Sequence, residues 1–196
     1  LWGDKIENEY NQFEFLTGYE NFEFNKQQFY NSLDYIVTSK PKKVEKHIPH
    51  YTKLPGYELE LFDTVYKELM NVFILDKDIS KSDINGLASR IEDVRISAIE
   101  AKLKGKKTLS NMHWKKYFSI VKSFATPRDL MWDNRVIKKK TFDYGYASTI
   151  HKIQGSSLKT VFVDMANVLT CKDINEIRQM QYVSLSRTKT DAYILV

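Results

Sequence analysis

Residues 146–157, Tyr-Ala-Ser-Thr-Ile-His-Lys-Ile-Gln-Gly-Ser-Ser, are the stretch that decides the fold of the later part of this chain. Tyr146 to Ile150 predict a short strand, and residues 151–155 predict a turn away from it. Gly155 has no Cβ, so the backbone there can turn tightly where a side chain would collide with a ligand. An ordinary turn between a strand and a helix would use the same glycine, so the stretch alone leaves both interpretations open.

The segments after this stretch predict an α/β arrangement. Thr160 to Asp164 is an apolar run typical of a buried strand in a parallel sheet, residues 173–184 have helical spacing, and residues 192–196 predict a last strand. A second polar stretch, Tyr-Val-Ser-Leu-Ser-Arg-Thr, occupies residues 182–188. Strand, helix and strand at this spacing fit part of an α/β sheet.

Residues 19–76 predict short antiparallel strands. Leu33, Tyr35 and Val37 alternate with polar neighbours, and proline or glycine separates such runs. Several short strands in so few residues predict a small β-barrel. Aromatic side chains in this region could stack on bases, but we expect core packing from most of them. They are Tyr19, Phe22, Phe24, Tyr30, Tyr51 and Tyr57.

Two helices are predicted after the strands. Residues 83–104 carry apolar side chains on one face, with Ser80 and Asp83 as a capping pair and Gly105 as the stop. A second helix is expected from about residue 111 to residue 124. Its aromatic residues are expected to pack in the core: Trp114, Tyr117 and Phe118.

The charge of the chain is unevenly distributed. The formal net charge is only +5 at pH 7, but residues 101–140 hold twelve Lys or Arg and two acidic residues. A basic block suits a phosphate backbone, although a solvated, lysine-rich surface would have the same composition. Within this block, Lys138, Lys139 and Lys140 are candidates for contacts with DNA.

Composition also excludes some classes of protein. No apolar run approaches the ~18 residues of a membrane span, and no signal peptide is visible. The single cysteine, Cys171, excludes an internal disulfide and fits a reducing compartment. No cysteine or histidine lies near it in sequence, so we expect no metal site. These features predict a cytoplasmic location.

Together, residues 146–157 and 182–188 resemble motifs V and VI of superfamily-one helicases, in the T-x-H-K-x-Q-G-S and Y-V-x-x-S-R forms of the Dda and RecD branch. In Dda-type phage helicases, a small SH3-like β domain with a helical extension is inserted into the second RecA-like domain ahead of motif V. The resemblance therefore implies an α/β fold, a partial RecA-like P-loop NTPase domain with an inserted SH3-like β-barrel. We expect a leading segment at 1–18, the insert at 19–135 and the C-terminal part of the RecA-like domain at 136–196.

The same resemblance implies contacts with single-stranded DNA. Thr149 and His151 would donate hydrogen bonds to phosphates, to which about half or more of protein–DNA hydrogen bonds go. His151 could instead be a structural histidine under the sheet. Lys152 could contact DNA or could only cap the loop.

The resemblance further implies a nucleotide site. Gln154, Gly155 and Ser156 would face ATP bound to the other RecA-like domain, and Arg187 would reach its γ-phosphate. Such an arginine finger places a fixed guanidinium where charge develops in phosphoryl transfer. The alternative for Arg187 is a residue that neutralises carbonyl groups at a helix end.

The phosphate-binding loop of such an enzyme is missing from this sequence. The one look-alike, Gly105-Lys106-Lys107-Thr108, has Lys107 where Ser or Thr belongs, and no Asp-Glu pair for Mg²⁺ follows an apolar strand. A start at Leu1, without Met, agrees with an expected C-terminal part of a longer protein, here called the parent enzyme. Alone, this chain is expected to bind neither ATP nor Mg²⁺ and to be inactive.

The parent enzyme would be an ATP-dependent DNA helicase. It would move 5′ to 3′ on single-stranded DNA and unwind duplex DNA. ATP and Mg²⁺ would be its cofactors, and the missing N-terminal RecA-like domain would help to bind them. Its expected partners are replication or repair proteins. The alternative is a non-catalytic module derived from a helicase, which binds nucleic acid or a protein. A Walker A loop upstream would distinguish the two.

Overall fold

The computed structural model describes residues 10–145, 150 and 157–195. The chain divides into two compact units, with the boundary between Gly145 and Tyr146. Each unit has its own cluster of buried apolar side chains. The strand predicted at Tyr146 to Ile150 lies outside the described residues, except for Ile150 itself.

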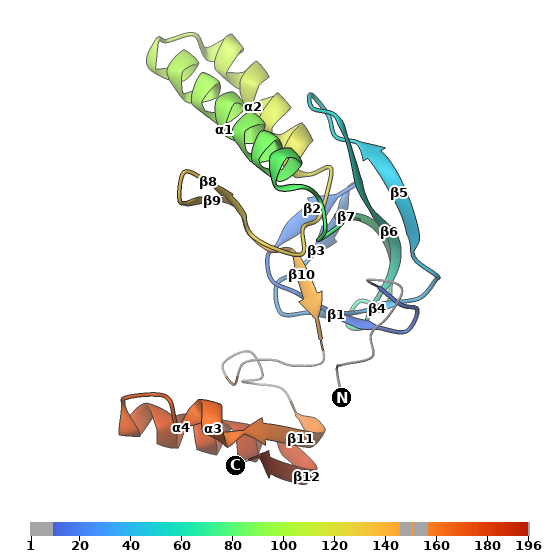
Figure 1. Ribbon diagram of the computed structural model, residues 1–196, viewed down its shortest axis with the longest axis vertical. Helices are drawn as coiled ribbons and strands as arrows, with labels where there is room; N and C mark the ends of the chain where they lie inside the picture. The colour runs from blue at the N-terminus through green and yellow to red at the C-terminus, as the bar shows by residue number, and fades with distance from the viewer. Residues whose placement is uncertain (1–9, 146–149, 151–156, 196) are drawn as a thin grey trace. The chain divides into compact units, whose positions relative to one another are not determined.

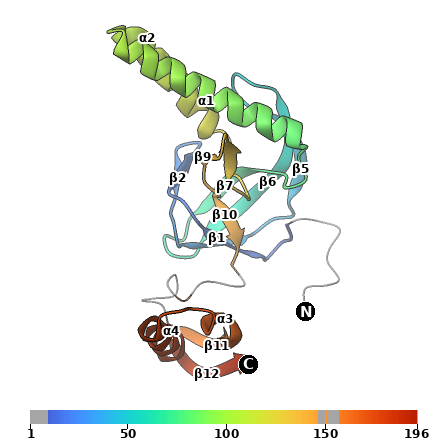
Figure 2. The same cartoon turned by 60° about the vertical axis from the view of Figure 1, so that its left-hand side comes forward.

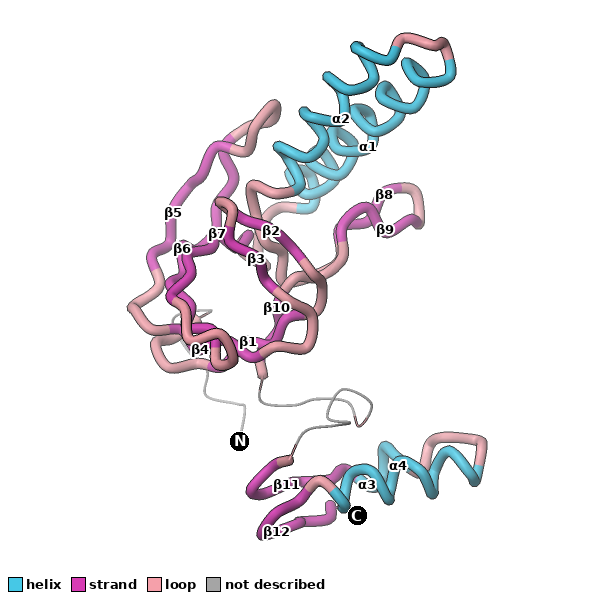
Figure 3. The backbone as a smooth tube through the Cα atoms, turned by 180° about the vertical axis from the view of Figure 1, so that it is seen from behind, coloured by secondary structure: helices cyan, strands magenta, loops and turns pink. Residues whose placement is uncertain are grey.

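A curled, six-stranded antiparallel sheet forms most of the first unit (Figures 1 and 3). Its strands are β1 (Phe15–Gly18), β4 (Asp34–Val37), β5 (Lys42–His47), β6 (Lys53–Asp63), β7 (Leu69–Leu75) and β10 (Phe142–Tyr144). The order is β10-β1-β4-β6-β5, and β7 also pairs with β6. Strand β6 pairs with β7 along one edge. Along its other edge it pairs first with β5 and then with β4. The sheet therefore curls into a half-barrel, as Figure 3 shows from behind.

Two small hairpins accompany this sheet. They are β2 (Phe22–Phe24) with β3 (Gln27–Phe29), and β8 (Leu130–Trp132) with β9 (Arg135–Lys138). Each is closed by two residues at positive φ, and these four residues are Asn25, Lys26, Asp133 and Asn134. Two successive residues at positive φ match the twist of the flanking strands. Asn and Asp tolerate that region better than most residues do, which explains three of the four positions.

Aromatic rings fill much of the half-barrel. The Phe142 ring meets the rings of Phe22 and Phe29 nearly at right angles, at centroid distances of 6.2 and 5.5 Å. Burial confirms the predicted core role of Phe22, Phe24 and Tyr57. The same prediction is wrong for Tyr30, which is exposed, whereas two further tyrosines are half-buried, Tyr19 and Tyr51.

Two antiparallel helices extend from the half-barrel (Figures 1 and 2), α1 (Lys81–Leu103) and α2 (Lys107–Val121). The predicted cap is confirmed, because the Ser80 hydroxyl accepts from the Asp83 amide at 3.0 Å. Gly105 adopts a φ of +71° just after the end of α1, as a helix stop requires. The helical extension predicted from the sequence is therefore present.

The face of α2 differs from the prediction. Within α2 the buried residues are Ser110 and Ile120, whereas Phe118 is 48% exposed and Trp114 and Tyr117 are half-buried. A helix in a two-helix hairpin buries only a narrow stripe against its neighbour. Trp114 and Tyr117 therefore lie at the edge of the buried stripe, and Phe118 lies outside it.

The second unit has the strand, helix and strand order that the sequence predicts. It contains β11 (Leu158–Asp164), α3 (Met165–Val168), α4 (Ile174–Ser186) and β12 (Thr188–Leu195). The two strands are parallel, as a crossover through a helix requires. Its core is small and consists of Val161, Val163 and Val168. The mixed α/β class agrees with expectation, while the RecA-like and SH3-like types stay predictions.

The unit boundary differs from the expected domain limits at residues 18 and 135. Strand β1, from the expected leading segment, pairs with β10, from the expected RecA-like part, with Leu16 opposite Tyr144. This hydrogen bonding joins both strands to the half-barrel sheet and moves the boundary to Gly145. Whether the first unit is an insert in a larger domain stays a prediction.

Candidate nucleotide and nucleic-acid site

The ends of the two motif segments meet in the second unit. Leu158 begins β11 directly after the stretch 146–157, and its amide donates to the Arg187 carbonyl at 2.8 Å. Leu158 is also the register partner of Thr188, the first residue of β12. The sheet thus brings the end of the first motif beside the arginine of the second.

Arg187 is the C-cap residue of α4, with φ −89° and ψ −7°. Its Nε is buried and has no hydrogen-bond partner among the described residues, and the same holds for the Thr188 hydroxyl. A buried donor without an acceptor costs about 1–3 kcal/mol, so such a group calls for an explanation.

Helix α4 positions Arg187. Asp173 caps its start by accepting from the Asn175 amide at 2.8 Å. Ile177 and Met180 pack against the small core of the second unit. Because one face of α4 is held in this way, its last residue and the following arginine have a defined backbone position.

Six of the predicted site residues lie outside the described part of the chain. They are Thr149, His151, Lys152, Gln154, Gly155 and Ser156. Their roles in binding DNA or nucleotide stay predictions. Ile150, between two of them, packs against the core of the second unit.

The first of the three candidate lysines, Lys138, points into the first unit. Its ammonium donates to the Val121 carbonyl at 2.9 Å and lies 5.0 and 5.3 Å from the ring centroids of Phe22 and Phe124. The residue as a whole is half-buried, but its charged end is enclosed, and this burial lowers the pKa of Lys138 to about 8. The charge of Glu20 opposes that effect.

The other two lysines are placed differently. The Lys140 ammonium pairs with Asp143 at 2.7 Å and lies 4.1 Å from the centroid of the Tyr19 ring. Lys139 is exposed. Contact with DNA stays a prediction for Lys139 and Lys140, and Lys139 is the better placed of these two to reach solvent. We expect no such contact from Lys138 while its ammonium is enclosed.

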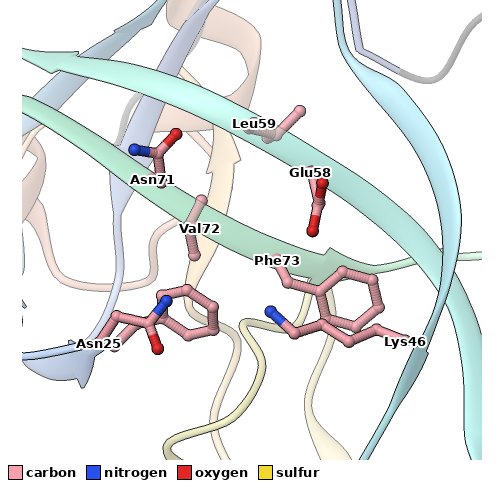
Figure 4. Close-up of a pocket in the computed structure, with 8 residues that line it drawn as sticks. Asn25, Lys46, Glu58, Leu59, Asn71, Val72 and Phe73 are labelled. Atoms are coloured by element: carbon pink, nitrogen blue, oxygen red, sulfur yellow. The ribbon is translucent and has the colours of Figure 1, made fainter.

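A cavity of about 250 Å³ opens on the half-barrel (Figure 4) and was not predicted. It is lined by Phe24, Asn25, Lys46, Glu58, Leu59, Asn71, Val72 and Phe73. The Lys46 ammonium lies 4.7 Å from the Phe24 centroid and 5.2 Å from that of Phe73, and burial lowers the pKa of Lys46. Nothing in the sequence near Lys46 indicates these two aromatic neighbours, because both come from other strands.

The described residues offer neither a metal site nor a membrane-spanning helix. In the part of the chain that the structure describes, no three His, Cys, Asp or Glu side chains are grouped to hold a metal ion. The Cys171 sulfur lies 3.2 Å from a Glu176 carboxylate oxygen. No described helix combines the length and the apolar character of a membrane span.

The second unit, which contains the Leu158–Arg187 hydrogen bond, falls in a region that matches a known protein family. Residues 144–195 match the family of the UvrD-like helicase C-terminal domain. The matched region includes β11, α3, α4, β12 and the candidate Arg187, and it supports a C-terminal region of a superfamily-one helicase. The first unit lies almost wholly outside it. A search of curated proteins finds no match to this chain.

Proposed function

We propose that this chain is the C-terminal part of an ATP-dependent DNA helicase that moves 5′ to 3′ on single-stranded DNA and unwinds duplex. The observation that carries the proposal is the hydrogen bond between Leu158, which directly follows the first motif segment, and Arg187 of the second, inside the matched region 144–195. The direction of movement rests on the resemblance to the Dda and RecD branch.

In this proposal Arg187 supplies positive charge to ATP bound by the preceding RecA-like domain. A guanidinium is planar and always charged, so it can follow the charge that develops on phosphoryl oxygens. Related arginine fingers contribute on the order of three to five decades of rate. Mg²⁺ would offset the negative charge of the ATP phosphates. The residues that bind it would belong to the part of the parent enzyme that holds the phosphate-binding loop.

Exposed apolar side chains on the second unit support a covering partner. Phe162 and Tyr193 stack on each other at 5.0 Å and are 68% and 52% exposed, and Leu195, on the same face of β12 as Tyr193, is 56% exposed. Single exposed apolar residues are ordinary, whereas neighbouring ones usually mark a contact surface. We assign this surface to further RecA-like structure of the parent enzyme.

The test is ATP hydrolysis by the full-length parent enzyme with Arg187→Ala. We expect kcat to fall about a hundredfold or more while the Kd for ATP changes little, because the arginine acts on the transition state. Arg178→Ala is the matched control, since Arg178 is exposed on the same helix. A kcat near that of the wild type would remove the assignment of Arg187.

The same preparation tests the alternative of a non-catalytic module. A wild-type parent enzyme that binds single-stranded DNA but shows no ATP turnover would favour that module over a helicase. Turnover that single-stranded DNA stimulates would favour the helicase.

A further inference from the structure

Helix α2 presents two stacked aromatic rings at its surface. Trp114 and Phe118 are one helical turn apart, with ring centroids 6.0 Å apart and an angle of 30° between the ring planes. Phe118 is 48% exposed and Trp114 is half-buried. The pair therefore forms a preformed apolar ledge along the outside of the helix.

Tyr117 fixes the orientation of both rings from the buried side. Its ring meets Trp114 at 5.4 Å and Phe118 at 5.3 Å, in both cases nearly at right angles. Tyr117 itself packs against the core of the first unit. Because the inner ring is held by the core, the two outer rings lose little freedom when a ligand binds them.

The helix that carries the ledge is rich in lysine, although Glu20 and Glu23 from other elements lie near it. Residues 107–121 of α2 include Lys107, Lys115 and Lys116 and no acidic residue, and Lys122 follows as the C-cap. Helical spacing places Lys107, Lys115 and Lys122 on the side of Trp114 and Phe118. The Lys122 ammonium lies 6.0 Å from the Phe118 centroid and pairs with Glu23, while Lys107 and Lys115 are exposed.

We propose that this face of α2, made of Lys107, Trp114, Lys115, Phe118 and Lys122, binds single-stranded DNA. Bases would stack on the two outer rings and the lysines would hold the phosphates, without preference for sequence. The proposal deepens the proposed function, on which the choice of single-stranded DNA rests. Duplex DNA is excluded as the main ligand because its base faces are covered. A protein partner fits less well, since the apolar area is two rings wide and is flanked by cations.

The first test uses the full 196-residue chain and a fluorescein-labelled oligo-dT, with affinity measured by fluorescence anisotropy. Phe118→Ala should weaken binding about tenfold, because stacking on one aromatic ring contributes about 1–3 kcal/mol and 1.4 kcal/mol is tenfold. Phe118→Tyr keeps the ring and should bind like the wild type. Met112→Ala is the matched control, since Met112 is 43% exposed on another side of the same helix.

The salt dependence of DNA affinity distinguishes the contribution of base stacking from that of phosphate contacts. Phe118→Ala should leave the slope of log K against log salt unchanged, whereas Lys115→Gln should lower that slope by about 0.7. Trp114→Phe should abolish the quenching of tryptophan fluorescence by oligo-dT, and Trp132→Phe should preserve it. Phe at position 114 keeps an aromatic ring, so the fold is retained.

An unchanged affinity in Phe118→Ala, or an equal loss in Met112→Ala, would overturn the proposal. Equal affinity for duplex and single-stranded oligonucleotides would also overturn it, and so would quenching that persists in Trp114→Phe. These outcomes are independent of the Arg187 test, because they measure binding and not ATP turnover. The helicase proposal can therefore survive the failure of this one, and the reverse also holds.

Discussion

Replacing Lys138 by Met should stabilise the protein at neutral pH and leave its affinity for DNA unchanged. The Lys138 ammonium is enclosed by the Phe22 and Phe124 rings and donates a hydrogen bond to the Val121 carbonyl. Burial lowers its pKa to about 8, compared with 10.5 for an ordinary lysine. Met has a similar length and no charge, so it removes the cost of enclosing a cation.

The sign of the pH dependence follows from the two pKa values. Between about pH 8 and pH 10.5 the unfolded chain binds more protons at this lysine than the folded chain does, so this lysine makes stability rise with pH. Below pH 8 both states are protonated and the full cost is present. At 1.36 kcal/mol for each pKa unit, that cost is on the order of 3 kcal/mol. The lost hydrogen bond to Val121 subtracts about 1 kcal/mol at every pH.

The assay is urea unfolding of wild type and Lys138→Met at several pH values between about 7 and 10. The stability advantage of the variant should shrink steadily above about pH 8, where the folded wild type loses its proton. Lys139→Met serves as the control, because Lys139 is exposed. Two parallel stability curves across this pH range would refute the reasoning.

Two further predictions use the same chain. Lys139→Gln should lower the slope of log K against log salt for single-stranded DNA by up to about 0.7, as expected for one lost phosphate contact, while Lys138→Met leaves that slope as it is. If both variants keep the wild-type slope, the DNA contacts lie elsewhere. Ser80→Ala should lower the free energy of unfolding by about 1 kcal/mol, because the Asp83 amide loses its acceptor at 3.0 Å. Thermal unfolding measures this loss, and an unchanged melting temperature would argue against a role of the cap in stability.

The helices could be predicted because their signals are local. The cap at Ser80, the apolar spacing in α1 and the stop at Gly105 all lie within a few residues of the structure that they produce. Strand β1 could not be assigned to its sheet in the same way. Its partner β10 is at the other end of the first unit, and no local pattern in residues 15–18 indicates it.

Phe118 and Lys138 show why the fate of a single side chain was harder to predict. An aromatic residue at helical spacing predicts core, and a lysine in a basic run predicts solvent, but Phe118 is exposed and Lys138 is enclosed. Both outcomes depend on which elements pack together. Arg187 could be identified from its motif, whereas its backbone bond with Leu158 depends on the pairing of β11 with β12.

The pairing of β1 with β10 places the entry and the exit of the first unit next to each other. Leu16 lies opposite Tyr144, and partners in an antiparallel pair have Cα atoms about 5 Å apart. A module whose two ends are adjacent can be inserted into a surface loop of another protein without separating the residues on either side of that loop. The first unit could also be deleted, because a short turn could join the two chain ends that its removal would leave. The half-barrel and its helices therefore have the adjacent ends that an inserted module needs, held together by the pairing of β1 with β10.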